Sequence, residues 1–146
     1  SGMSDFRQIN EEFLASPQIS VADVAAAKEM GVTMIVNNRP DDEEPGQVSG
    51  AQIADAAKAA GIEYRAIPVT HAGFGQGQVD AMTEALESSE GPVLAYCRSG
   101  TRSTLLWALA RAKQGANPSV IASQAAKGGY DVSPVRQIID MLSAGR

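Results

Sequence analysis

The hydrophobic positions of this chain fall into short apolar runs that alternate with longer, alanine-rich stretches. Continuous apolar runs at 32–37 and 93–96 have the length and the side chains of strands buried on both faces of a sheet, and residues 62–68 predict a further strand. Residues 13–19 predict one more short strand that runs into a turn. Strands that alternate with helices favour a parallel sheet with helices packed on both of its faces.

Capping residues and glycines delimit the expected helices. Ser20 and Asp23 have the spacing of a capping box, and Ser49 stands where an N-cap is expected. Pro118 directly follows the capping residue Asn117, as proline does at the first position of a helix. The resulting helices are expected at about 21–30, 50–60, 78–88, 102–114, from 118 onward, and 135–142.

The length of the chain suits one domain with a single core, since 146 residues lie within the usual domain size. No internal repeat and no linker interrupts the alternation of strands and helices. Ser1 and Gly2 ahead of Met3 resemble the scar that remains after a tag is removed. We therefore assign residues 1–3 to a tag remnant and residues 4–146 to a single domain.

Composition argues against several classes of function. The net charge of −5 gives no reason to expect nucleic acid or an anionic membrane as a partner. No run approaches the ~18 apolar residues of a membrane span, and no signal-peptide core stands near the start. A single cysteine, Cys97, and a single histidine, His71, argue against a disulfide framework and against a zinc or iron site. We expect a cytoplasmic protein that uses no metal and no other cofactor.

Basic residues nevertheless cluster around the cysteine. Cys97 ends the apolar run VLAY and begins the sequence CRSGTRS, which leads into the helix expected from about Arg102. A loop between the carboxyl end of a strand and the N-terminus of a helix is where ligands bind in open α/β sheets. Positions 91–130 carry no acidic residue, and their basic residues are Arg98, Arg102, Arg111, Lys113 and Lys127.

The loop after Cys97 has the residues of an anion-binding site. Backbone N–H groups at a helix start have no intrahelical partner, and the helix dipole adds to their attraction for negative charge. The same field would stabilise a thiolate at Cys97 and make it a nucleophile. Gly100 would allow a close approach of the backbone to the anion. The residues expected to bind the anion are Arg98, Ser99, Gly100, Thr101, Arg102 and Ser103.

Side chains of the loop complete the predicted chemistry. Arg102 can offer two N–H groups to the oxygens of a bound anion, or donate to a persulfide. The hydroxyl of Ser103 or Thr101 can donate to the sulfur when it leaves. A lone cysteine can also be a small buried hydrophobe. The coincidence of strand, glycine, arginines and helix favours the nucleophile.

CRSGTRS after a hydrophobic strand resembles the signature loops of the protein tyrosine phosphatase superfamily and of rhodaneses. From about residue 5 to 144, the chain is similar to the phosphatase-like domain of bacterial beta-lactamase-hydrolase-like proteins. Besides the CRSGTRS loop, the segments that carry this resemblance are FLASPQIS, VTMIVNNRPDDE, YRAIPV and GGYDVSPVRQ. The resemblance implies a three-layer, dual-specificity-phosphatase-like α/β fold with a mostly parallel sheet of about four to five strands. It also implies that Cys97 is the nucleophile, Arg102 clamps the anion, and Ser103 supplies the hydroxyl beside the thiolate.

Two departures from the phosphatase pattern favour sulfur transfer. Phosphatase loops place five residues between cysteine and arginine, whereas residues 98–101 give the four of rhodaneses, and Tyr96 replaces the usual preceding histidine. A shorter ring of amides suits a terminal persulfide sulfur better than a tetrahedral phosphate. Related phosphatases often carry an aspartate three residues after the proline equivalent to Pro68. This chain has His71 there, and Asp80 is the first acid downstream. Ester hydrolysis needs such an acid more than sulfur transfer does.

Three further features near the expected site have open roles. His71 lies in a glycine-rich loop, where it is a general acid, a substrate-positioning group or a solvated side chain. Arg98 either widens the positive rim or is an exposed loop arginine. Arg39, at the same sheet edge, is expected to pair with the acidic run 41–44, which is itself typical of a solvated loop.

Three classes of function remain. The favoured one is a rhodanese-type sulfurtransferase of sulfide or persulfide metabolism that carries a persulfide on Cys97. Its substrate would be small and anionic or a persulfide, with a thiol such as glutathione as acceptor. The alternative is a phosphatase-type hydrolase with a phosphocysteine intermediate. The third is a non-catalytic anion-binding module, against which the intact Cys97, Arg102 and Ser103 argue. The oligomeric state stays open.

Overall fold

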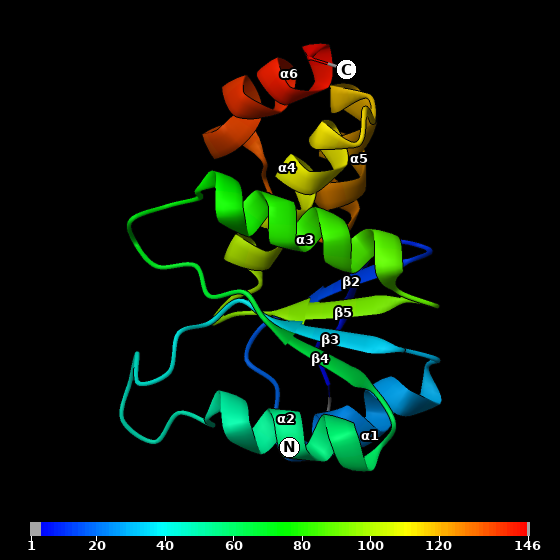
Figure 1. Cartoon of the computed structure of the whole chain (residues 1–146), viewed down its shortest axis with the longest axis vertical. Coiled ribbons are helices and arrows are strands. Elements are labelled where there is room, and N and C mark those ends of the chain that lie inside the picture. The colour runs from blue at the N-terminus through cyan, green and yellow to red at the C-terminus, as the bar shows by residue number, and fades with distance from the viewer. Residues whose placement is uncertain (1–3, 146) are drawn as a thin grey trace.

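A central five-stranded sheet organises the part of the chain that the computed structural model describes, residues 4–145 (Figure 1). Its strands stand in the order β1-β2-β5-β3-β4. All neighbours pair in parallel except β1, which pairs antiparallel with β2. The predicted tag remnant, residues 1–3, lies outside the described residues. The strands are β1 (Arg7–Asn10), β2 (Phe13–Ser16), β3 (Met34–Asn37), β4 (Glu63–Ala66) and β5 (Val93–Tyr96).

Helices cover both faces of the sheet, as Figure 1 shows. One face carries α1 (Val21–Glu29) and α2 (Gly50–Ala59). The other carries α3 (Gln76–Ser88), α4 (Thr101–Lys113), α5 (Pro118–Lys127), the 3-10 turn η1 (Ser133–Val135) and α6 (Arg136–Ala144). This arrangement confirms the predicted three-layer α/β fold with a mostly parallel sheet. Within residues 4–145, every helix is too short or too polar to cross a lipid bilayer.

Two features differ from the sequence prediction. β1 was not expected, because it is short and polar, buries only Ile9, and pairs irregularly between Gln8 and Asn10. The last helix begins at Arg136, one residue later than expected, because the chain first makes a 3-10 turn over Ser133–Val135. The hydroxyl of Ser133 donates to Asp131 at 2.9 Å at the start of this turn.

The helix α4 is the centre of the hydrophobic core above the sheet. Its residues 103–110 are all buried, since the helix lies between the sheet and the helices α3, α5 and α6. Trp107 stacks on Phe13 of β2 with 5.6 Å between the ring centroids, which ties the helix to the sheet. The expected core residues Leu105, Leu106 and Leu109 are buried beside it. A fixed α4 also fixes the loop that precedes it.

Parallel pairing brings the loops after β2, β3, β4 and β5 to one edge of the sheet. Asn37 of β3 is in register with Tyr96 of β5, and the next backbone N–H, from Asn38, donates to the Tyr96 carbonyl at 2.8 Å. The loop after β3 and the loop that begins at Cys97 therefore start side by side. The loops after β3 and β4 reach out together at the left of Figure 1.

Removal of the Trp107 ring tests whether α4 is anchored through the core. Trp107→Ala should lower the free energy of unfolding by about 3–5 kcal/mol, because it leaves a cavity against Phe13. Urea unfolding followed by circular dichroism measures it. Met141→Ala is the matched control, because Met141 is 73% exposed and its loss should cost less than about 0.5 kcal/mol. Equal effects of the two substitutions would contradict this account of the core.

Candidate functional site

An open pocket of about 540 Å³ lies at the sheet edge where the loops meet. It is lined by residues of the loops after β3, β4 and β5 and of the first turn of α4, namely Pro40, Glu43, Thr70, His71, Arg98 and Arg102. Cys97 is 0% exposed and is not among these lining residues. The loops after β3 and β4, for which the sequence indicated no definite role, therefore form the pocket together with the predicted anion-binding loop after β5.

The backbone of the cysteine loop is held around the sulfur. The N–H of Gly100 donates to the sulfur of Cys97 at 3.1 Å. The N–H of Cys97 donates to the carbonyl of Ser16 at 3.3 Å, which fixes the start of the loop on β2. Gly100 has φ +91, a left-handed conformation that favours glycine, and it forms the N-cap of α4. The sulfur consequently faces an N–H group and the start of a helix, both of which stabilise negative charge.

The guanidinium of Arg102 is oriented by two fixed acceptors. Its Nη1 and Nη2 donate to the two carboxylate oxygens of Glu43 at 2.7 and 2.8 Å, and Nη1 also donates to the carbonyl of Val69 at 2.8 Å. The hydrogen bond that Arg102 donates to Glu43 raises the pKa of Arg102, and the charge of the nearby Cys97 adds to this shift. The edge formed by Nε and Nη2 remains for Cys97 or for the oxygens of a bound anion.

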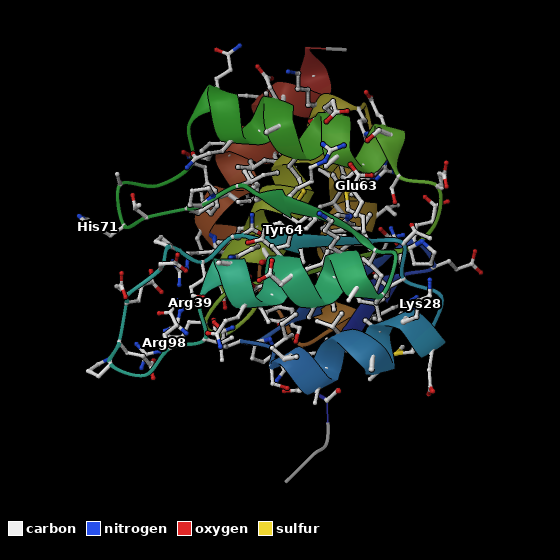
Figure 2. The ribbon with its side chains drawn as sticks, turned by 60° about the horizontal axis from the view of Figure 1, so that its bottom comes forward. Lys28, Arg39, Glu63, Tyr64, His71 and Arg98 are labelled. Carbon is white, nitrogen blue, oxygen red and sulfur yellow. The ribbon has the colours of Figure 1, made fainter. Side chains whose placement is uncertain are left out.

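Glu43 bridges Arg102 to a second, buried arginine. Arg39 is 4% exposed, and its Nε donates to Glu43 while its Nη2 donates to Glu44, both at 2.9 Å. Its Nη1 donates to Gln18 at 3.0 Å. Hydrogen bonds from Arg102, helped by those from Arg39, lower the pKa of Glu43 to about 2. Figure 2 shows Arg39 and Arg98 close together at the left, beside the loop after β3, and both contact Glu44. We call this chain of ion pairs, Arg102–Glu43–Arg39–Glu44, the arginine–glutamate ladder.

The structure brings the other predicted residues to the site with different contacts. Ser103 is fully buried, but its hydroxyl has no hydrogen-bond partner among the described residues, so it does not contact the sulfur as expected. The Ser99 hydroxyl donates to Thr101 Oγ1 at 3.0 Å and accepts the Thr101 N–H at 3.3 Å. Ser99 thus helps to start α4, and Thr101 does not reach the sulfur through a hydrogen bond.

Arg98 and His71 stand at the mouth of the pocket. The side chain of Arg98 is 68% exposed, and its Nε lies 3.6 Å from Glu44, a weak contact that leaves the group available. His71 lines the pocket from the loop after β4, and Figure 2 shows it at the outer end of that loop. Asp80, the first acid downstream, pairs with Lys113 on neighbouring helices and does not line the pocket.

Glu43 is the site residue that sequence reasoning missed. The expected pairing of Arg39 with the acidic run is confirmed, and the run is an exposed loop as expected, but Glu43 within it also pairs with Arg102. The sequence feature that could have indicated this role is the opposite charge of two loops. An acidic run follows β3 and a basic run follows β5, and because these strands are neighbours in the sheet, the two runs meet.

A metal site was not expected, and the described residues hold no candidate for one. No group of at least three His, Cys, Asp or Glu side chains within residues 4–145 stands close enough to bind an ion. The chemistry available at the pocket is that of a thiol, backbone amides, arginines, a carboxylate and an imidazole.

The depressed pKa of Glu43 predicts how its contribution to stability depends on pH. Because the pKa falls from its ordinary value of 4.5 to about 2 in the fold, this contribution is complete above about pH 4.5 and is lost as pH falls toward about 2. Glu43→Gln should therefore be less stable than the wild type above that range, with a difference that shrinks below it.

Urea unfolding from pH 2 to 7 measures that difference. Arg102→Gln removes the largest cause of the shift, so in that background Glu43→Gln should show a smaller pH-dependent difference. A difference between the wild type and Glu43→Gln that stays constant down to pH 2 would contradict the ladder.

Comparisons with known proteins place this site in a family context. Residues 5–114 match the family described as beta-lactamase hydrolase-like protein, phosphatase-like domain. A beta-lactamase hydrolase-like protein of Agrobacterium fabrum is 38% identical over 108 residues, which are 74% of this chain and 25% of that protein. One from Xylella fastidiosa is 35% identical over 107 residues, 73% of this chain and 25% of that protein. The chain thus spans about a quarter of the length of these curated relatives.

Solved structures share the fold over nearly the whole chain. A candidate phosphatase from Neisseria meningitidis has a TM-score of 0.82 and 33% identity, covering 96% of this chain and 99% of that one. P. aeruginosa TpbA, solved in complex with pTyr, has a TM-score of 0.66 and 18% identity, covering 99% and 91%. PTPMT1 has a TM-score of 0.74 and 11% identity, covering 96% and 97%. The last two likenesses concern the fold alone. The match over most of its length and the shared phosphatase-like fold show that the chain belongs to the family of the phosphatase-like domain of beta-lactamase hydrolase-like proteins.

Proposed function

We propose that this chain hydrolyses phosphate monoesters through a phosphocysteine intermediate on Cys97. The observation that carries the proposal is one loop that holds the Cys97 sulfur, the Gly100 N–H that donates to it and, where the loop enters α4, the guanidinium of Arg102 that Glu43 orients. Membership in a phosphatase-like family supports this function over the sulfurtransferase that the loop spacing favours. The substrate is a small anionic ester that reaches the open pocket.

The reaction proceeds in two displacements at phosphorus. The Cys97 thiolate attacks the phosphorus, a P–S bond forms, and the bond to the ester oxygen breaks. The amides of the loop and the free edge of Arg102 hold the phosphoryl oxygens, where negative charge is concentrated. Water then attacks the phosphocysteine, the P–S bond breaks, and inorganic phosphate leaves with the thiolate restored.

The proton for the departing oxygen comes from His71. Glu43 is close to the arginine, but its pKa of about 2 leaves it ionised and unable to donate at neutral pH. His71 lines the same pocket, and its imidazole can act as a general acid and base. In its protonated form it gives that proton to the leaving oxygen, and in the second step it takes one from the attacking water. This requires the exposed loop after β4 to bring the imidazole inward.

A second candidate function rests on one observation, the four-residue spacing between Cys97 and Arg102. A sulfurtransferase would take a sulfur atom from a persulfide or thiosulfate donor onto the Cys97 thiolate, leaving the donor thiolate or sulfite. It would then pass this sulfur to a thiol acceptor such as glutathione. The same amides and arginine would hold the persulfide.

Intact-protein mass separates the two functions. Under the phosphatase proposal, brief incubation with an aryl phosphate followed by acid quench should add ~80 Da at Cys97, because the phosphoryl group stays on sulfur. Thiosulfate or glutathione persulfide should add nothing stable. A gain of ~32 Da from a sulfur donor, with no Cys97-dependent phosphate release, would overturn the phosphatase proposal in favour of sulfur transfer. Cys97→Ser is the control that should lose both adducts.

Arg102→Lys tests whether the arginine acts through its shape or only through its charge. Lysine keeps the positive charge but loses the planar fork, which here serves Glu43 with one edge and the substrate with the other. We expect kcat/KM to fall by about 100-fold or more, nearly as far as in Arg102→Ala. Near-normal turnover of the lysine variant would mean that charge alone suffices. Arg136→Lys is the control, since Arg136 pairs only with Asp140 on α6.

A further inference from the structure

Tyr130 contacts the cysteine loop from a part of the chain beyond the family match, which ends at residue 114. Its hydroxyl donates to the carbonyl of Ser99 at 3.0 Å, and the residue is 8% exposed. Burial raises the pKa of this phenol, and the nearby charge of Arg7 opposes the shift. Tyr130 therefore reaches the site that the proposed function uses, although it does not line the pocket.

The contact fixes the direction of one peptide unit. In a planar trans peptide the carbonyl and the following N–H point in opposite directions. The carbonyl of Ser99 points to Tyr130, so the N–H of Gly100 points the other way, toward the Cys97 sulfur at 3.1 Å. If this peptide unit turned over, a carbonyl oxygen would face the sulfur and repel a thiolate or an oxyanion.

The neighbouring peptide unit, Arg98–Ser99, is held in the same manner by a different donor. The carbonyl of Arg98 accepts the N–H of Gln18 at 3.2 Å, so the N–H of Ser99 points away from Gln18. Two donors outside the loop, the Gln18 N–H and the Tyr130 hydroxyl, thus bind its carbonyls. The loop can present its N–H groups to an anion because its carbonyls have other partners.

The segment around Tyr130 is built to place the phenol at this point. A Cβ on Gly128 would stand 2.4 Å from the Cδ1 of Ile9 in β1, so a side chain there would require the buried Ile9 to move. The Arg7 guanidinium lies over the Tyr130 ring, 5.3 Å from its centroid. A Cβ on Gly100 would stand 2.0 Å from the Tyr130 hydroxyl, so the contact requires glycine on the loop side.

From these contacts we infer that Tyr130 is a positioning residue, which holds the Ser99–Gly100 peptide with its N–H toward the Cys97 sulfur and the bound oxyanion. Its hydrogen bond also polarises that peptide and strengthens the N–H as a donor. The inference rests on the proposed function only where turnover is measured. Anion affinity and thiol reactivity test it without turnover.

Tyr130→Phe keeps the ring and removes the donor. The matched control is Tyr64→Phe, because the Tyr64 hydroxyl accepts from Asn37 at 3.0 Å on the other face of the sheet and does not contact the loop. We expect the affinity for orthovanadate, measured by calorimetry, to fall about 5- to 10-fold in Tyr130→Phe and to stay within about 2-fold in Tyr64→Phe. Alkylation of Cys97 by iodoacetamide at pH 7 should slow by a similar factor.

Kinetics with an aryl phosphate separate positioning from general support of the fold. In Tyr130→Phe, kcat should fall more than KM changes, because the amide acts most strongly on the charge of the transition state. Arg7→Gln is a milder variant that keeps the hydroxyl but loosens the ring, with an expected loss of about 2-fold. It serves as the test if Tyr130→Phe proves unstable.

The outcomes separate this inference from the proposed function. Vanadate affinity and alkylation rates in Tyr130→Phe equal to those of Tyr64→Phe would overturn the role of Tyr130, whatever the turnover. A wild type that releases no phosphate, yet loses vanadate affinity in Tyr130→Phe, would overturn the phosphatase proposal and leave the positioning role supported.

Discussion

The parallel pairing of β3 with β5 is the constraint on which the site depends. It aligns Asn37 with Tyr96, so the chain leaves the two strands at adjacent points as an acidic loop and a basic loop. Neither loop could hold its charges at a partly buried sheet edge alone, because unpaired charges there lose their hydration. The charges of the two loops pair with each other, and the pocket forms where these loops and the loop after β4 come together.

The arginine–glutamate ladder turns this pairing into a fixed geometry. Arg39 is almost completely buried, and removing a partner from such a group typically costs about 3–5 kcal/mol, which holds the ladder together. Glu43 then stands between two arginines and cannot turn without exposing one of them. Arg102 is oriented through its end edge, and its other edge remains for an anion. A mobile lysine or an unsupported arginine would have to lose side-chain entropy on binding, whereas this one has lost it on folding.

The sequence predicted the fold and the cysteine loop because their signals are local. The apolar runs, capping residues and CRSGTRS loop each lie within a few consecutive residues, and the element boundaries agree to within a few positions. β1 escaped prediction because its stability comes from pairing with β2 and from α5 rather than from its own polar sequence. The roles of Glu43 and Tyr130 were not predicted, because each depends on contacts with a segment that is distant in the sequence. The run DDEE does not distinguish Glu43 from its neighbours until the strand order is known.

The contacts of Gln18 and Tyr130 with the cysteine loop help to explain how a loop with the short, rhodanese-like spacing could serve a phosphatase on this fold. With four residues between Cys97 and Arg102, the loop has fewer amides to offer than the usual phosphatase loop. A loop of fewer amides can serve an oxyanion if each amide is held in the right direction. Donors outside the loop, at Gln18 and Tyr130, bind two consecutive carbonyls, and the Ser99–Gly100 peptide directs its N–H at the sulfur. The phosphatase proposal therefore depends on the orientation of the peptide units as well as on ring size, and that orientation depends on residues far from the motif.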